Sequence, residues 1–248
     1  MAGRLAGRIA VVTGGSSGIG QEIARRLSSE GADIAVADVS PADETGAFVE
    51  ANGRRFLSAK VDVSDGAQVN AFAAEVRDTL GRVDILVNNA VNVTMGDFEQ
   101  VTFEEWTQTF SVNVNGAFLT AKAFLEDLKH SSAGRVINMT SSSYWVSPPP
   151  LVSYISAKGA LNGFTSVLAA NLAAYDVTVN AVAPSLVGTA KVLQHTSEEF
   201  IAQTVQMQDL RRLQTPEEVV GTVAFLASDD AAFITGQIIA VDGGSTRR

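Results

Sequence analysis

The stretch "RIAVVTGGSSGIG", residues 8–20, joins a short apolar run to a glycine-rich loop and then to a helical pattern. The run at 8–13 predicts a buried strand, and the pattern after the loop predicts a helix that ends at Gly31. Glycines let a backbone approach a pyrophosphate, and a helix N-terminus adds N–H donors and the positive end of a dipole. This order predicts a nucleotide site; a plain strand-to-helix turn is the alternative.

The same alternation of apolar runs and helical patterns continues to the end of the chain. Further strands are expected at 33–38, 54–63, 84–90, 134–141, 177–184 and 237–244. Helices are expected at 41–51, 65–80, 117–130, 153–174 and 215–228. Strands that are apolar throughout and separated by helices predict a parallel sheet covered on both faces. The fold class is therefore α/β and doubly wound, with seven strands in one domain spanning 1–248.

Composition excludes several classes of function. The 248 residues carry a formal net charge of −9 and show no basic stripe, which argues against nucleic acid as a partner. There are no cysteines and only two histidines, His130 and His195, so we expect no disulfide and no metal site. The first 15 residues lack the apolar run of a signal peptide, and no stretch has the length of a membrane span. A cytoplasmic location is the expectation.

Two aspartates follow predicted strands at the edge where the glycine loop lies. Asp38 ends the second strand, and its carboxylate can accept hydrogen bonds from ribose hydroxyls while repelling a 2′-phosphate. No Arg or Lys lies in 14–20 or 39–45 to offset that repulsion, which favours NAD over NADP. Asp62 ends the third strand and could hold the adenine amino group. The "NNA" motif at 88–90 predicts either a tie between neighbouring loops or direct cofactor contact.

Tyr154 and Lys158 are four residues apart at the start of a predicted helix, so they share one face. A free tyrosine has a pKa near 10, and a nearby ammonium group and a cationic nicotinamide would favour its phenolate. We therefore expect the pKa of Tyr154 to be lowered. Ser141 lies 13 residues earlier, at the end of a strand, where its hydroxyl could hold a substrate oxygen against the tyrosine.

The motifs "TGGSSGIG", "NNA", "SVNVNGAF", "YISAK" and "VNAVAPSLVGT" occur in this order. Together with Ser141, they resemble the classical short-chain dehydrogenase/reductase family along essentially the whole chain. The resemblance implies a Rossmann-like domain and a catalytic tetrad of Asn113, Ser141, Tyr154 and Lys158. It also implies these cofactor-binding residues: Gly14, Ser17, Gly18, Ile19, Gly20, Asp38, Asp62, Val63, Asn89, Ala90, Tyr154, Lys158, Pro184, Val187 and Thr189.

Two positions depart from the family pattern: Val91 follows "NNA" and Ser185 follows the "AP" of the sixth strand, where glycine is usual. Within the family, the stretches "TSSSYWVSPPPLVSYISAK" and "AVDGG" are similar to (S)-1-phenylethanol dehydrogenase-like secondary-alcohol dehydrogenases. This similarity implies NAD as cofactor and a small-molecule alcohol or ketone as substrate. Family precedent, with alanines on more than one face of the helix at 153–174, implies a homotetramer.

The expected substrate contacts are Ser141, Tyr144, Trp145 and Tyr154, and an irregular segment at 186–214 is the expected lid. This surround is largely apolar, which favours an uncharged hydrophobic or aromatic substrate. Trp145 could equally be a core or interface aromatic. The triple proline at 148–150 predicts an extended, stiff wall before the catalytic helix. Two alternatives stay open: an NADPH-dependent 3-oxoacyl-[acyl-carrier-protein] reductase and a non-catalytic NAD(H)-binding module.

Overall fold

In the computed structural model, which describes residues 3–247, seven parallel strands form one sheet in the order β3-β2-β1-β4-β5-β6-β7. The strands are β1 (Ile9–Thr13), β2 (Asp33–Asp38), β3 (Phe56–Lys60), β4 (Ile85–Asn88), β5 (Arg135–Met139), β6 (Thr178–Pro184) and β7 (Ile238–Val241). The order reverses between β1 and β4, and such a switch point opens a ligand crevice at the carboxyl ends of the strands. The predicted doubly wound, Rossmann-like fold is confirmed.

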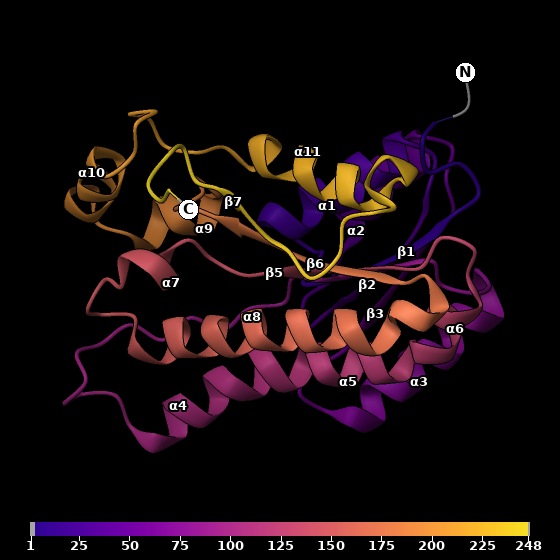
Figure 1. Cartoon of the computed structure of the whole chain (residues 1–248), viewed down its shortest axis with the longest axis horizontal. Coiled ribbons are helices and arrows are strands. Elements are labelled where there is room, and N and C mark those ends of the chain that lie inside the picture. Colours follow the sequence, from indigo (N-terminus) through magenta and orange to yellow (C-terminus); the bar gives the residue numbers. More distant parts are fainter. Residues whose placement is uncertain (1–2, 248) are drawn as a thin grey trace.

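Helices cover both faces of the sheet (Figure 1). One layer holds α1 (Gly18–Ser29), α2 (Asp43–Ala51) and α11 (Pro216–Ala227). The other holds α3 (Gly66–Thr79), α4 (Phe103–Phe110), α5 (Gly116–Ala123), α6 (Leu125–His130) and α8 (Val152–Leu172). Side chains alternate along β1, so that Ala10 and Val12 join the core under α1 and α11 while Val11 joins the core under α3 and α8.

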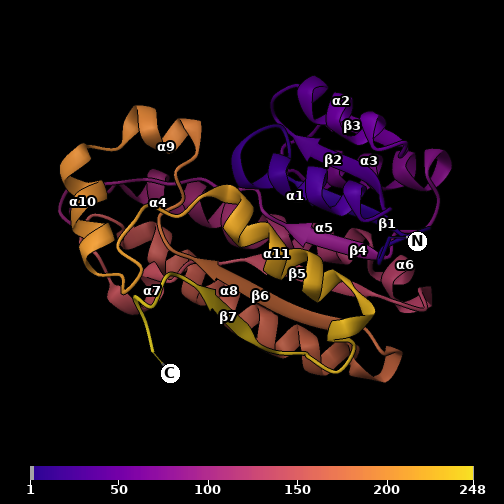
Figure 2. The ribbon, with the colours of Figure 1, turned by 90° about the horizontal axis from the view of Figure 1, so that it is seen from above.

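The remaining short helices gather at one end of the molecule (Figure 2). They are α7 (Ser143–Val146), α9 (Ala190–His195) and α10 (Glu198–Gln206). The segment 186–214, expected to be irregular, therefore contains two helices. Both begin with a side-chain cap: Thr189 accepts from the Val192 N–H, and Ser197 accepts from the Phe200 N–H. These short caps carry a weaker signal than apolar periodicity, which explains why the pattern missed both helices.

Three further expectations change in detail. The helix expected at 117–130 is broken at Phe124, and α4 occupies part of the loop expected after β4. The wall between β5 and α8 is only partly extended. It starts with the one-turn helix α7, passes through Ser147 at a φ of 48°, and turns at the prolines, where the Leu151 N–H donates to the Pro148 carbonyl at 3.2 Å.

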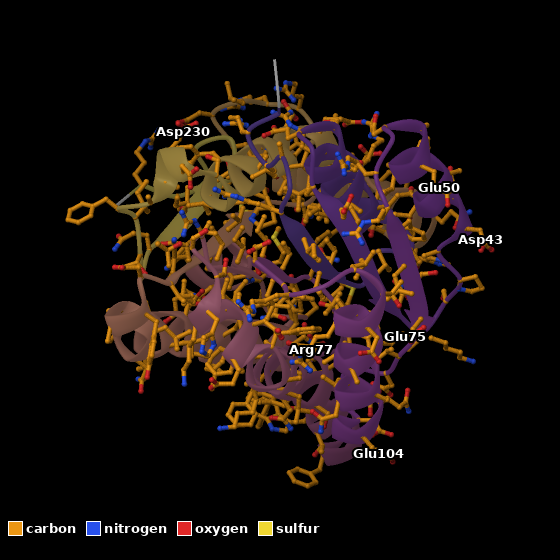
Figure 3. The ribbon with its side chains drawn as sticks, turned by 90° about the vertical axis from the view of Figure 1, so that its right-hand side faces the viewer. Asp43, Glu50, Glu75, Arg77, Glu104 and Asp230 are labelled. Atoms are coloured by element: carbon orange, nitrogen blue, oxygen red, sulfur yellow. The ribbon has the colours of Figure 1, made fainter. Side chains whose placement is uncertain are left out.

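Several acidic side chains lie on the outside of this framework. Figure 3 shows Asp43, Glu50, Glu75, Glu104 and Asp230 at the periphery, and all five are exposed. They contribute to the net charge of −9 without entering the core. Within residues 3–247, no helix combines the length and apolar character that crossing a bilayer requires.

Candidate active site

The glycine loop after β1 has a conformation that demands its glycines. Gly14 and Gly18 have φ values of 65° and 57°, which side-chain-bearing residues rarely adopt. A β-carbon on Gly20 would lie 2.0 Å from the Gly14 carbonyl oxygen and 2.5 Å from Asn89 Nδ2. The loop therefore folds tightly over the first turn of α1, with the Asn89 side chain packed against it.

The N-terminus of α1 offers donors to an anion. Ser17 occupies the N-cap position but makes no side-chain capping bond, so it leaves the first N–H groups without that partner. Ile19 packs against the core beneath the loop. Thr189, at the start of α9, lies opposite, since a β-carbon on Gly18 would meet Thr189 Cγ2 at 3.3 Å. These features fit a pyrophosphate held between the loop and the base of the lid.

Two aspartates at the same edge are already partly engaged. Asp38 Oδ2 accepts from the Ser16 N–H at 2.9 Å, and its Oδ1 accepts from the Ser40 N–H at 3.0 Å. These bonds hold the carboxylate at the end of β2 beside the glycine loop. Asp62 is half-buried, and its Oδ1 accepts from Ser64 N and Ser64 Oγ. Val63, next to it, is buried against Gly116.

Asn89 ties the glycine loop to β4. Its side-chain nitrogen donates to the Thr13 carbonyl at 3.0 Å and to the Gly14 carbonyl at 2.9 Å. The Thr13 hydroxyl in turn accepts from the Asn89 and Ala90 backbone N–H groups. The structure shows the tie between loops that "NNA" predicts as one interpretation, and direct contact with a cofactor stays a prediction. Asn89 thus supports the cofactor loop through the position of Gly14.

Ser141, Tyr154 and Lys158 come together at the carboxyl end of β5. The Ser141 hydroxyl hydrogen-bonds to Tyr154 and lies 2.8 Å from Ser143 Oγ. Lys158 is buried and donates from Nζ to the Met139 carbonyl at 2.7 Å, with its ammonium 5.5 Å from the centroid of the Tyr154 ring. The serine chosen by spacing is therefore the one that meets the tyrosine.

Burial governs both titrating groups. It raises the pKa of Tyr154 above its usual 10, and the Ser141 hydrogen bond only partly opposes that rise. Burial also lowers the pKa of Lys158 from 10.5 to about 7, because the charged ammonium loses hydration there; its hydrogen bond is donated to a neutral backbone carbonyl. The expectation of a lowered tyrosine pKa is wrong for the protein alone. In this state the phenol stays protonated at neutral pH.

Asn113 lies in a π-helical turn, Ser111–Asn115, between α4 and α5. Its Nδ2 donates to the Asn92 carbonyl at 2.7 Å and to the Thr109 carbonyl at 2.8 Å. Its Oδ1 is buried without a hydrogen-bond partner among the described residues. A small cavity next to it is lined by Thr13, Asn88 and Asn113 together with apolar side chains. Single π turns often mark functional positions, and this one carries a buried acceptor without a partner beside the cavity.

Two glutamines that the sequence patterns did not indicate hold the segment 186–214, the expected lid, to the end of β6. Gln208 Oε1 accepts from the Ser185 hydroxyl at 2.8 Å, and Gln214 Oε1 accepts from the Ser185 N–H at 3.1 Å. Val187 forms a parallel bridge with Gln214 and is buried. Pro184 ends β6, and its carbonyl accepts from the Ser142 N–H at 3.0 Å. Ser185, a departure from the family pattern, thus anchors the lid; no periodicity in the sequence signals this.

The aromatic residues of α7 lie beside the catalytic helix. The Tyr144 ring covers Gly159, where a β-carbon would come within 2.8 Å of Tyr144 Cε2, and it meets Trp145 edge-on at 5.7 Å. The loop after β4 joins this wall through Gly96, whose N–H donates to the Pro150 carbonyl at 2.9 Å. Val91 is half-exposed at the mouth of the site. The triple proline therefore connects two loops across the rim.

Comparisons with known proteins agree with this geometry. A family model described as "Enoyl-(Acyl carrier protein) reductase" matches residues 14–246. A solved mutant of a short-chain dehydrogenase/reductase from Serratia marcescens superposes with a TM-score of 0.92 at 32% identity, covering 98% of this chain and 100% of that one. The chain belongs to the short-chain dehydrogenase/reductase family.

Curated relatives within the family act on different substrates. A (2S)-[(R)-hydroxy(phenyl)methyl]succinyl-CoA dehydrogenase subunit, BbsD, from Thauera aromatica is 34% identical over 96% of each chain. A 3-oxoacyl-[acyl-carrier-protein] reductase from Synechocystis is 36% identical over 97% of each chain. Short-chain dehydrogenase/reductases bind a nicotinamide cofactor and act on small molecules, so this chain is an oxidoreductase acting on CH–OH groups.

The packing of the glycine loop predicts the effect of one methyl group. Gly20→Ala should lower the free energy of unfolding by about 2 kcal/mol, because the methyl group meets backbone that has no room to retreat. It should also weaken binding of the reduced nicotinamide cofactor, measured by fluorescence titration. Gly221→Ala in α11 is the control: nothing lies within 4 Å, and alanine should stabilise the helix by about 0.5–1 kcal/mol. Unchanged stability and binding in Gly20→Ala would contradict the tight loop.

The buried lysine predicts how stability depends on pH. Lys158 binds its proton less tightly in the folded chain (pKa about 7) than in the unfolded chain (10.5), so the unfolded chain holds more protons between these values. The free energy of unfolding of the wild type, relative to Lys158→Met, should therefore rise by a few kcal/mol from pH 7 to 10.5. Urea denaturation of both proteins at matched pH values measures this difference. A difference that stays flat with pH would contradict the lowered lysine pKa.

Proposed function

We propose that this enzyme transfers a hydride between NAD(H) and a secondary alcohol or ketone, with a hydrophobic or aromatic substrate. The observation that carries the proposal is the cluster at the end of β5. There the Ser141 hydroxyl hydrogen-bonds to Tyr154, and Lys158 is anchored at the Met139 carbonyl one helical turn beyond the tyrosine. The glycine loop lies along the same sheet edge, so cofactor and substrate can meet there.

In this mechanism, the reversible reaction converts a secondary alcohol and NAD to a ketone, NADH and a proton. The bound nicotinamide supplies the hydride acceptor or donor. Tyr154 exchanges the proton with the substrate oxygen: its protonated phenol can donate to a ketone, and its phenolate can accept from an alcohol. Ser141 Oγ holds the substrate oxygen, and Lys158 favours the phenolate when charged. Asn113, with its unused Oδ1, holds a water in the proton path.

NAD is favoured by the position of Asp38. Its carboxylate is held at the end of β2 by two backbone N–H groups, where it can bind ribose hydroxyls and would repel a 2′-phosphate. The register partner of Asp38 on β3 is Lys60, which is exposed and, within residues 3–247, forms no salt bridge with Asp38. The residues proposed to hold the cofactor are those of the glycine loop, Asp38, Asp62, Val63, Ala90, Pro184, Val187 and Thr189.

The substrate class and the assembly rest on apolar side chains. Val91, Val93, Met95, Tyr144, Leu193 and Met207 expose apolar surface around the mouth between the β4 loop, α7 and the lid. They favour an uncharged substrate. On the outer face of α5 and α8, Phe118 and Val167 are more than half exposed, and Phe118 meets Phe164 at 6.4 Å. Such a face is suited to burial between subunits, and we propose a homotetramer.

The cofactor assignment predicts a difference in affinity. NADH should bind at least about tenfold more tightly than NADPH, which corresponds to about 1.4 kcal/mol. Asp38→Asn should shrink that gap mainly by improving NADPH binding, because it removes the repulsive charge and keeps the shape. Paired fluorescence titrations measure both. Tighter NADPH binding by the wild type would overturn the assignment and would favour the carrier-protein reductase alternative, with Lys60 offsetting Asp38.

The mechanism predicts that Tyr154→Phe abolishes turnover while NADH binding survives, since only the exchangeable phenol proton is lost. Turnover is measured with NAD and a panel of aliphatic, aromatic, sugar and steroid alcohols. Tyr175→Phe is the matched control, because Tyr175 lies in the short turn after α8, outside the candidate site, and this variant should keep most of the activity. Full activity in Tyr154→Phe would refute the mechanism. Preference for a sugar alcohol would refute the hydrophobic substrate class.

A further inference from the structure

A chain of four buried polar side chains crosses the centre of the fold beneath the candidate active site. The Thr120 hydroxyl lies 2.7 Å from Asn88 Oδ1, Asn88 Nδ2 donates to Asn138 Oδ1 at 2.9 Å, and Asn138 Nδ2 donates to Thr165 Oγ1 at 2.9 Å. All four residues are at most 5% exposed. The Thr165 hydroxyl donates its own hydrogen bond to the Leu161 carbonyl at 2.8 Å. The amide groups supply a donor and an acceptor for the two central steps, while Asn88 Oδ1 at 2.7 Å and the Gly116 carbonyl at 2.8 Å compete for the single proton of the Thr120 hydroxyl.

The two ends of this chain lie on the two helical segments that carry candidate catalytic residues. Thr165 is seven residues after Lys158 on α8, and two helical turns place them on the same face. Thr120 is seven residues after Asn113, on α5, which continues directly from the π-helical turn. Asn88 and Asn138 are register partners on β4 and β5. The chain therefore spans from the Asn113 segment to the Lys158 segment through two central strands.

Strand β5 and the residues just after it also contact α8 at two further points. Along β5 and just beyond it, the Asn138 side chain, the Met139 carbonyl and the Ser141 hydroxyl come in order. Their partners on α8, taken in the same order, are Thr165, Lys158 and Tyr154. The partners run backwards along the helix because α8 is antiparallel to the strand. Three polar contacts thus set the position of α8 along β5.

Apolar packing alone would fix that position poorly. The buried apolar residues of α8 are Ala157, Leu161, Ala169 and Leu172, and hydrophobic contact among such side chains is non-directional. Buried hydrogen bonds are directional, and leaving one of their groups unpaired is costly. A shift of α8 by a fraction of a turn would break the contact between Asn138 and Thr165.

We propose that Thr120, Asn88, Asn138 and Thr165 are positioning residues that fix the spacing between Asn113 on one side and Tyr154 with Lys158 on the other. Their side chains bond to one another, and Asn88 also lines the small cavity beside Asn113. They act by holding α5 and α8 to the same pair of strands. Their role in catalysis rests on the proposed function, because these four residues maintain the geometry of the proton path in that reaction.

The test replaces one hydroxyl with a methyl group of similar size. Thr165→Val should lower kcat by about tenfold or more with an unchanged KM, because small displacements of catalytic groups cost rate more than substrate affinity. Thr165→Ser keeps the hydroxyl and should restore kcat to near the wild-type value. Thr120→Val should reproduce the loss from the other end. The double variant should lose less than the product of the two single losses, because one chain is broken in both.

The controls separate positioning from general destabilisation. Leu172→Val or Leu172→Ala, whichever matches the melting temperature of Thr165→Val, should keep kcat, because Leu172 lies on α8 outside the hydrogen-bonded chain. The positioning role is overturned if the matched Leu172 variant loses as much kcat, if Thr165→Val stays within about twofold of wild type, or if serine fails to restore the rate. If Thr165→Val does not fold, judged by loss of NADH binding, Thr120→Val decides by the same criteria.

A second readout is independent of turnover. The protein is labelled with 3-fluorotyrosine, and the ¹⁹F signal of Tyr154 is assigned from its absence in Tyr154→Phe; the chain has three tyrosines. Thr165→Val should move the Tyr154 signal, and Thr165→Ser and the matched Leu172 variant should leave it in place. If the wild type turned over none of the alcohols, the proposed function would fail, and this signal would still test the positioning. An unmoved signal in Thr165→Val would overturn the positioning role.

Discussion

The site depends on one constraint: the seven strands run parallel, so their carboxyl ends meet at one edge of the sheet. Residues that are far apart along the chain, such as Gly14, Asp38, Ser141 and Pro184, each follow or end a strand and so reach that edge. The reversal of strand order between β1 and β4 separates the helices on either side and leaves room for a ligand. Loops then add the specific groups, and the segment 186–214, the expected lid, follows β6 at the same edge.

Burial in the absence of a countercharge shapes the chemistry of the site. Lys158 is buried with its ammonium bonded to a backbone carbonyl, and the loss of hydration lowers the pKa of that ammonium to about 7. The pKa of Tyr154 is raised for the same reason, because the phenolate, like the lysine ammonium, loses hydration when it is buried. A carboxylate next to Lys158 would keep the lysine charged but would also disfavour the phenolate. The carbonyl orients the lysine without adding a charge, so the protonation states of Lys158 and Tyr154 depend on the charges of the ligands that the site binds.

The fold was largely predictable because its strands are apolar and its helices periodic. β2 matches its expected range, and the other strands lie within theirs. The errors fall where tertiary contacts override local pattern. α9 and α10 depend on their N-terminal caps and on hydrogen bonds that fix the following residues. Gln208 and Gln214 bond to Ser185, directly after β6, and Gln214 also bonds to the Val241 carbonyl of β7. The helix expected at 117–130 breaks at Phe124, whose fully buried side chain packs edge-on against Phe72 of α3.

Sequence by itself determined which residues could form the site. The glycine spacing, the Tyr154–Lys158 pair and the distance back to Ser141 are local features whose geometry follows from helix and strand periods. Only the tertiary structure decided what each of them meets. The Asn89 amide bonds to the glycine loop, and the Ser185 hydroxyl bonds to Gln208 in the segment 186–214. Asn88 on β4 bonds to Asn138 on β5. Such contacts join residues tens of positions apart, and no local pattern specifies the partner of a single buried polar side chain.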